Sequence, residues 1–214
     1  MLRYINNITL RIDYSTIFSA LGYKRKSTEL PDLFRKEIKG WIDEALHAVK
    51  LDAVTARCEI SFPDDESVLL SPEGSNPEGS QPETIRIASA SLRRFLSSSS
   101  KALIMGITAG SAVTELIDKY QIENMTKAVV LDAAAGEIVD AGFDYIVSLL
   151  NRELARESGR LLSKRFSPGY GDLTLNAQGD FFRLLDMEKL GVTLTDSFIL
   201  KPRKSVIAIT GIVY

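Results

Sequence analysis

The chain has 214 residues, of which 26 are basic, 28 are acidic and 45% are hydrophobic, with a formal charge of -2. This composition is typical of a globular chain that buries a core, and the mixed, nearly balanced charges disfavour a nucleic-acid partner. With one cysteine, Cys58, and one histidine, His47, the chain lacks an internal disulfide and has too few ligands for a structural zinc site.

Residues 1–7 lack the apolar segment that directs export, and no stretch approaches the roughly 20 apolar residues that cross a bilayer. We therefore expect a cytoplasmic protein without membrane insertion. A nucleophilic serine or cysteine usually needs a partner base, and His47 lies within a helical pattern. No catalytic side chain is predicted.

In chain order, the first half combines short elements with one long amphipathic helix. Ile8, Leu10 and Ile12 alternate with polar residues, as in a half-buried strand. Pro31 suits the first turn of a helix, and 63–84 collects Pro, Gly, Ser and acidic residues. The predicted elements are a strand at 8–12, a brief helix capped by Ser15 or Thr16 and running through Phe18 and Leu21, a helix at 31–49, a strand at 54–62 and a mobile excursion at about 63–84.

The second half continues the alternation of helices and strands. The predicted elements are helices at 91–96, 112–120, 125–157 and 176–190, and strands at 102–107, 161–166, 192–200 and 205–213. Small residues within 125–157 permit the close approach of another backbone. Helices clustered between separated strands favour an α+β fold, a single domain over 1–214 with a bent, largely antiparallel sheet flanked by helices.

The hexamer Arg165-Phe166-Ser167-Pro168-Gly169-Tyr170 carries the most distinctive chemistry. Arg165 can bind a carboxylate with two parallel hydrogen bonds, and the Pro-Gly turn exposes backbone atoms at close range. Tyr170 offers a flat face and a hydroxyl. The group suits a free amino acid with an aromatic or cationic appendage; the alternative is an ordinary strand-ending turn with a solvated arginine.

This hexamer resembles the Arg-x-x-Pro-Gly-Tyr signature of the activation domain of cobalamin-dependent methionine synthase, a domain that binds S-adenosylmethionine. Residues 190–198, with the following Pro202 and Ser205-Val206, are similar to the family's Gly-x-x-Leu-Thr-Glu-Ser-Phe stretch and its Pro and Ser-Val. Residues 12–18 resemble its Ile-Asp-Trp-Thr-Pro-Phe-Phe element. Both ends of the chain therefore support the resemblance, which the middle shares more weakly.

The resemblance implies an S-adenosylmethionine site built from five positions around these motifs. Asp13 would face the ligand's α-ammonium and Arg165 its carboxylate, while Ser167 would contact the adenine through backbone atoms. Tyr170 would lie beside the sulfonium, and Gly169 would leave room for the ligand. Read without the resemblance, an aspartate such as Asp13 is more often a helix cap or turn residue.

Asp140 is the sixth predicted site residue and stands where the family has a glutamate on its long helix. It shares an i, i+4 stripe with Asp132, Gly136 and Asp144, so a solvated helix face is the alternative.

The resemblance implies a stand-alone reactivation component that presents S-adenosylmethionine to cob(II)alamin on a separate methionine synthase or other corrinoid protein. No metal site is expected in the chain itself. Arg152, Arg156, Arg160 and Lys164 recur every four residues and form a candidate docking surface for a flavodoxin-like electron donor, or a solvated flank. Two alternative functions remain, a non-catalytic S-adenosylmethionine sensor and a reactivation component for another corrinoid methyltransferase.

Overall fold

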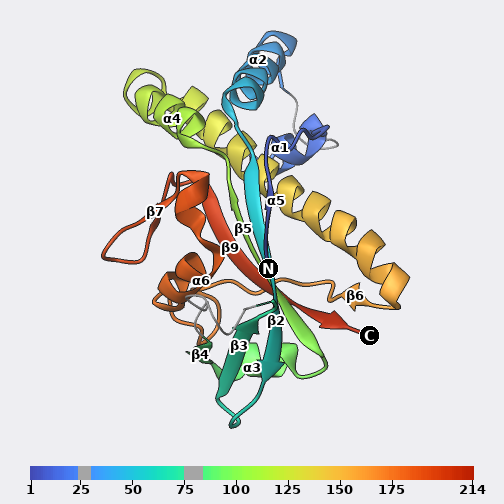
Figure 1. The fold of residues 1–214 in the computed structure, drawn as a ribbon. Coiled ribbons are helices and arrows are strands. Elements are labelled where there is room, and N and C mark those ends of the chain that lie inside the picture. Colours follow the sequence, from blue (N-terminus) through green and yellow to red (C-terminus); the bar gives the residue numbers. More distant parts are fainter. Residues whose placement is uncertain (24–29, 75–83) are drawn as a thin grey trace.

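The computed structural model describes residues 1–23, 30–74 and 84–214, and the strand β5 (Lys101–Thr108) lies at the centre of its sheet. β5 pairs antiparallel with β2 (Asp52–Ser61) on one side and with β9 (Ser205–Val213) on the other. The sheet is open and twisted (Figure 1).

Four shorter strands extend the sheet on both sides. β1 (Leu2–Ile5) pairs with residues 53–56 of β2, and β3 (Ser67–Pro72) pairs with residues 58–61 along the same edge. β4 (Ile85–Ala88) follows β3, and β6 (Arg160–Leu161) pairs with the end of β9. The order β4-β3-β2-β5-β9-β6 is antiparallel throughout, and β7 (Thr193–Leu194) and β8 (Leu200–Lys201) form a separate hairpin.

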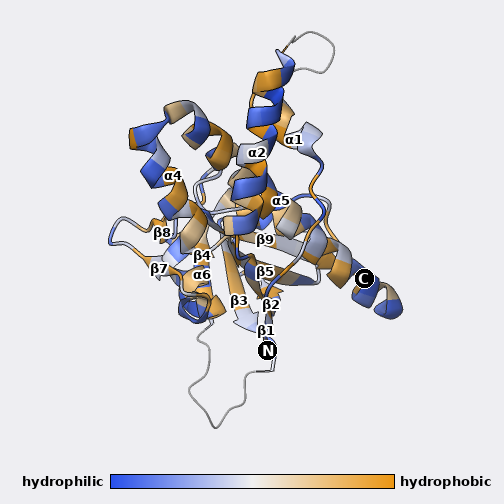
Figure 2. Ribbon diagram, turned by 90° about the horizontal axis from the view of Figure 1, so that it is seen from above, coloured by the Kyte–Doolittle hydropathy of each residue, from blue (hydrophilic) through white to orange (hydrophobic). Residues whose placement is uncertain are grey.

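Helices cover both faces of this sheet (Figure 1). One face packs against α1 (Tyr14–Ala20), α2 (Asp32–Ala48), α4 (Ser111–Glu123) and α5 (Met125–Leu154). The other packs against α3 (Ala90–Leu96), α6 (Ala177–Leu185) and the 3-10 turn η2 (Met187–Leu190); a second 3-10 turn, η1 (Ala155–Glu157), follows α5. In Figure 2 the central strands are largely hydrophobic, whereas α2 and α4 alternate between hydrophobic and hydrophilic residues.

The two covered faces explain the continuous apolar run of β5. Leu103, Met105 and Ile107 contribute to the core beneath α5, whereas Ala102 and Ile104 contribute to the core beneath α6. A strand buried on both faces shows a run of apolar residues without polar alternation.

A glycine lets α5 lie close to the sheet at one point. A Cβ atom on Gly142 would be 2.5 Å from Cδ1 of Ile107 and 2.9 Å from Cδ2 of Leu51. By contrast, a Cβ atom on Gly136 would have only Nζ of Lys204 nearby, at 3.9 Å. The small residues of this helix were expected to permit the close approach of another backbone; at Gly142 it is the side chains of Ile107 and Leu51 that approach.

The predicted α+β class with a largely antiparallel sheet is confirmed, and so are the central strands and long helices. The strand predicted at 8–12 is wrong, because among the described residues this segment has no strand partner, although the Ile8 amide donates to the Leu51 carbonyl at 2.8 Å; β1 lies earlier, at Leu2–Ile5. Part of the excursion predicted at 63–84 is the strand β3, and residues 75–83 lie outside the described residues.

Three C-terminal elements are shorter than predicted. The strand at 161–166 is reduced to β6 and an isolated bridge, and the helix at 176–190 is divided by Asp186, whose φ is +49°. The strand at 192–200 is instead the β7–β8 hairpin, because Thr195 bonds Ile199 across a turn, with 2.9 Å between the Thr195 nitrogen and the Ile199 oxygen. In the part of the chain that the structure describes, no helix is long and apolar enough to cross a bilayer.

Candidate ligand-binding cleft

The segment between Leu162 and Phe166 bulges out of the sheet and carries Arg165 with it. The backbone of Leu162 bonds Gly211, and Phe166 exchanges two 2.8 Å backbone hydrogen bonds with Ile209. Between these two points of contact, four residue steps from Leu162 to Phe166 lie opposite only two steps, from Gly211 to Ile209, on β9. The hydroxyl of Thr210 on β9 donates to the Lys164 carbonyl at 2.9 Å, which satisfies a group that the interrupted ladder leaves unpaired.

Ser167 to Tyr170 form a tight turn directly after this bulge. The Tyr170 amide donates to the Ser167 carbonyl at 3.1 Å, and Gly169 has a φ of +95°. Proline followed by a residue of positive φ is typical of a type II turn. No atom outside its neighbours lies within 4 Å of a Cβ built on Gly169, so the backbone here is open on that side.

Aspartate 172 fastens the turn to the helix α3. Its carboxylate accepts hydrogen bonds from the Ser89 hydroxyl at 2.5 Å and from the backbone amides of Ala90 at 2.9 Å and Ser91 at 3.1 Å. The Ser89 hydrogen bond, with those from Ser91 and Ala90, lowers the pKa of Asp172. The position of Tyr170 thus depends on an anionic cap at the start of α3.

α5 supplies the opposite wall, where one arginine faces two carboxylates. Nη1 of Arg165 donates to Oδ1 of Asp144 at 2.8 Å, and its Nη2 lies 3.8 Å from Oδ1 of Asp140. The guanidinium carbon lies 4.9 Å from the centre of the Phe143 ring. Arg165 is therefore held by an ion pair and by an aromatic face at the same time.

These elements enclose a cleft of about 660 Å³ between α5, the bulge, the turn and the start of β9. Four of the six predicted site residues line it: Asp140, Arg165, Ser167 and Tyr170. Gly169 lies in the turn between two lining residues but does not itself line the cleft. The Tyr170 side chain is 66% exposed and its ring lies 6.4 Å from that of Phe166, so an aromatic surface borders the opening.

Asp13 is not among the residues that line the cleft. It is the N-cap of α1, and its carboxylate accepts hydrogen bonds from the Ser15 amide at 2.8 Å and the Ser15 hydroxyl at 2.6 Å. The helix-cap alternative is thus the structural role that the geometry gives this residue.

Several residues of the cleft were not predicted from the sequence. Gln178 of α6 lines it and donates from Nε2 to the Phe198 carbonyl at 2.6 Å, which ties α6 to the β7–β8 hairpin. The stripe of acidic residues on α5 offered a signal for Asp144, and Pro168 and Ser205-Val206 stand in the matched motifs, but none of these was predicted as a site residue. The lining residues that were not predicted are Phe143, Asp144, Ser163, Lys164, Pro168, Gln178, Ser205, Val206, Ile207 and Ala208.

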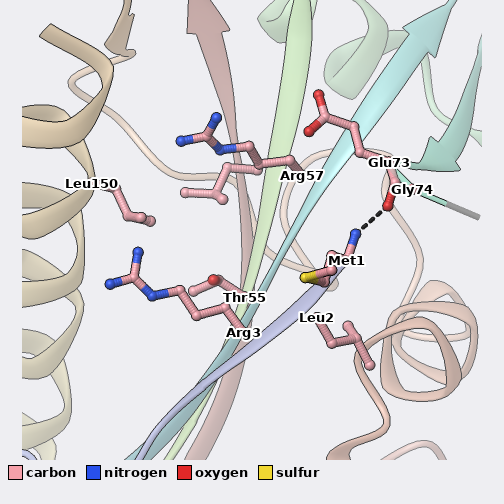
Figure 3. A pocket seen from close by; sticks show the side chains of 9 residues that line it. Met1, Leu2, Arg3, Thr55, Arg57, Glu73, Gly74 and Leu150 are labelled. Atoms are coloured by element: carbon pink, nitrogen blue, oxygen red, sulfur yellow. Dashed lines mark hydrogen bonds between the residues drawn. The ribbon is translucent and has the colours of Figure 1, made fainter. Parts of the chain in front are cut away.

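A second cavity, of about 520 Å³, lies between β1, β2 and α5 (Figure 3). Arg3 and Arg57 extend toward α5 there, on either side of Thr55. Both carboxylate oxygens of Glu153 bond Arg3, at 2.9 and 2.7 Å, and a carboxylate oxygen of Glu157 lies 3.8 Å from Arg57. Each of the two guanidinium groups therefore already faces a carboxylate.

The four predicted basic positions lie along the exit from α5. Arg152 is in the last turn of α5, Arg156 in η1 and Arg160 in β6, and Lys164 lines the cleft. All four are exposed. Among the described residues, no cluster of three or more His, Cys, Asp or Glu side chains could hold a metal ion.

Comparison of the sequence with protein-family models and with curated proteins finds no match. Among solved structures, the chain is similar to a crystal structure of the MetH reactivation domain bound to AdoHcy, with a TM-score of 0.68. The similarity covers 99% of this chain and 78% of that chain, at 14% sequence identity. The two chains therefore share a fold.

Proposed function

We propose that the cleft beside Arg165 binds S-adenosylmethionine. The observation that carries this proposal is that Asp140 of α5 and the hexamer residues Arg165, Ser167 and Tyr170 line one cleft. The similar fold of a reactivation domain bound to AdoHcy supports it, because AdoHcy is the product left when S-adenosylmethionine gives up its methyl group.

The charges of the cleft match this ligand. S-adenosylmethionine carries an α-carboxylate, an α-ammonium and a sulfonium, so it needs one cation and more than one anionic or aromatic surface. Arg165 supplies the cation, Asp140 and Asp144 supply the anions, and Tyr170 supplies the aromatic face. A cleft of about 660 Å³ also lies in the size range of small-molecule sites.

The function that we propose for the bound ligand is the reductive remethylation of cobalamin. One electron from an external donor reduces cob(II)alamin to cob(I)alamin, whose cobalt attacks the methyl carbon of S-adenosylmethionine. The cobalt–carbon bond forms with the electron pair of cob(I)alamin as the sulfur–carbon bond breaks. The electron pair of the broken sulfur–carbon bond stays on sulfur in the departing AdoHcy. The chain's own residues need only bind and orient the methyl donor, since the sulfonium is already activated.

The proposed partner is a separate cobalamin-dependent methionine synthase, or another corrinoid protein, in the cytoplasm. A flavodoxin-like protein is the proposed electron donor, and the exposed Arg152, Arg156, Arg160 and Lys164 are its candidate docking surface. Neutralising Arg152 and Arg156 should weaken donor binding and reduce its salt dependence, because exposed charge pairs are screened by salt.

Calorimetric titration with S-adenosylmethionine tests the ligand. Arg165→Ala should weaken binding by about 2 to 5 kcal/mol, or roughly 30-fold and more, because it leaves a carboxylate without its partner in the complex. Arg160→Ala is the matched control, since Arg160 is exposed on β6 and does not line the cleft. A folded wild-type protein that binds neither S-adenosylmethionine nor AdoHcy would contradict the proposal.

Single-turnover methylation of a reduced corrinoid protein tests the reaction. Transfer of the methyl group is expected with the wild type and not with Arg165→Ala at the same ligand concentration. Tight binding without any transfer would instead indicate a sensor of S-adenosylmethionine. Co-purification would identify the corrinoid partner, and so separate methionine synthesis from another corrinoid methyltransferase.

A further inference from the structure

We infer that Asp144 binds the α-ammonium of the ligand, so that the Arg165–Asp144 ion pair binds both charged groups of its amino-acid end, the α-carboxylate and the α-ammonium. This inference rests on the proposed binding of S-adenosylmethionine. It gives Asp144 the role that the sequence resemblance implies for Asp13.

The geometry of the ion pair leaves both partners able to bond a ligand. Asp144 uses Oδ1 for Arg165, at 2.8 Å, and among the described residues no hydrogen bond uses its Oδ2. The Asp144 side chain is 78% exposed and lines the cleft. Arg165 bonds Asp144 through Nη1, and its planar fork has further N–H donors for a carboxylate.

An α-amino acid presents its two charges from a single carbon atom, so their partners must also be adjacent. Arg165 and Asp144 are in direct contact, and each has the charge opposite to one of the ligand groups. The ligand can therefore extend the ion pair into a ring of alternating charges without separating Arg165 from Asp144. This arrangement keeps every charge paired during binding.

The two other candidate carboxylates fit this role less well. Asp13 caps α1 with hydrogen bonds from Ser15 to both of its oxygens and does not line the cleft. Asp140 lines the cleft, but its nearer oxygen is 3.8 Å from Arg165, one helical turn before Asp144. Asp140 is therefore less closely joined to the arginine that would hold the ligand's carboxylate.

Asp144→Asn is tested with S-adenosylmethionine and with its α-keto analogue, in which a carbonyl replaces the ammonium-bearing carbon. The analogue keeps the carboxylate and the sulfonium. Loss of a charge-assisted hydrogen bond should weaken binding of S-adenosylmethionine by about 10- to 100-fold and leave binding of the analogue unchanged. An equal loss for both ligands would overturn the inference, because it would mean that Asp144 acts only by positioning Arg165.

Matched variants separate this inference from its alternatives. Asp132→Asn lies on the same helix outside the cleft, in an ion pair of 2.9 Å with Lys204, and should leave both affinities unchanged. Asp13→Asn should do the same; loss of S-adenosylmethionine binding there, with full binding in Asp144→Asn, would overturn the inference. A folded wild type that binds neither ligand nor AdoHcy refutes the proposed function itself.

Discussion

The packing of α5 against the sheet allows a sharp test of the fold, because two glycines of this helix differ only in their surroundings. Alanine at position 142 would bring a Cβ atom to 2.5 Å from Ile107 and 2.9 Å from Leu51, both buried in the core. Normal carbon contacts begin near 3.5 Å, so both side chains would have to shift by several tenths of an ångström or more. Overpacking of this kind destabilises a protein by about 1 to 3 kcal/mol.

Gly136→Ala provides the reference for this change. Replacing glycine by alanine inside a helix stabilises it by about 1 kcal/mol, and at position 136 no close contact opposes that gain. The helix-propensity gain is common to the two variants and cancels when they are compared. Gly142→Ala should therefore be less stable than Gly136→Ala by about 1 to 3 kcal/mol, because only the cost of overpacking distinguishes the two variants.

Urea unfolding and thermal unfolding measure this difference. In a chain of this length, 1 kcal/mol corresponds to a shift in Tm of about 2 to 4 °C. Equal stability of the two variants would refute the close contact of α5 with Ile107 and Leu51. Because Gly142 immediately precedes Phe143 at the wall of the cleft, its alanine variant is also expected to bind S-adenosylmethionine more weakly, whereas Gly136→Ala is not.

Two further predictions concern titratable groups. Burial raises the pKa of the Cys58 thiol to about 12, so thiol reagents at about pH 8 should label it only after unfolding, and rapid labelling of the native protein would contradict its burial. The Ser89 hydrogen bond holds the pKa of Asp172 below its ordinary value of 3.8, so its stabilising effect is present above about pH 4 and is lost as the pH falls through the lowered pKa. Asp172→Asn should lower Tm near neutral pH and converge with the wild type in acid; parallel Tm curves over the whole range would rule out this role.

The long elements could be predicted because their patterns come from burial. The apolar run of β5 reflects two covered faces, and the helical spacing of α2 and α5 reflects one buried face each. The error at 8–12 has the same origin. Ile8, Leu10 and Ile12 do alternate toward the core, but their segment pairs with no strand beyond one hydrogen bond from Ile8 to Leu51. Alternation reports which side is buried and says nothing of ladder pairing.

The candidate site could be predicted where its residues are contiguous in sequence. Arg165, Ser167 and Tyr170 are neighbours in the chain, so one motif found them together. Gln178 reaches the cleft through tertiary packing, which no local pattern encodes. The acidic stripe marked Asp144 and a motif marked Ser205-Val206, but only the packing of α5 and β9 brings them to the cleft. Asp13 was predicted by resemblance alone, and the general alternative for an aspartate, a helix cap or turn, describes its place in the structure; the cap predicted at Ser15 or Thr16 is wrong, because Asp13 caps α1.

The bulge beside β9 also constrains how the length of this segment can change. The bulged segment has two more residues than a regular ladder would place opposite β9. Because two is an even number, the side chains of Leu162 and Phe166 point to the same face of the sheet on either side of the bulge. Insertion or removal of a single residue would reverse this parity and direct Phe166 away from the Phe95 ring, whose centre lies 5.6 Å from its own. Removal of a pair would preserve the core while withdrawing the arginine from the opening. Length variation here in steps of two would thus remove Arg165 from the proposed site, or restore it, within an unchanged fold.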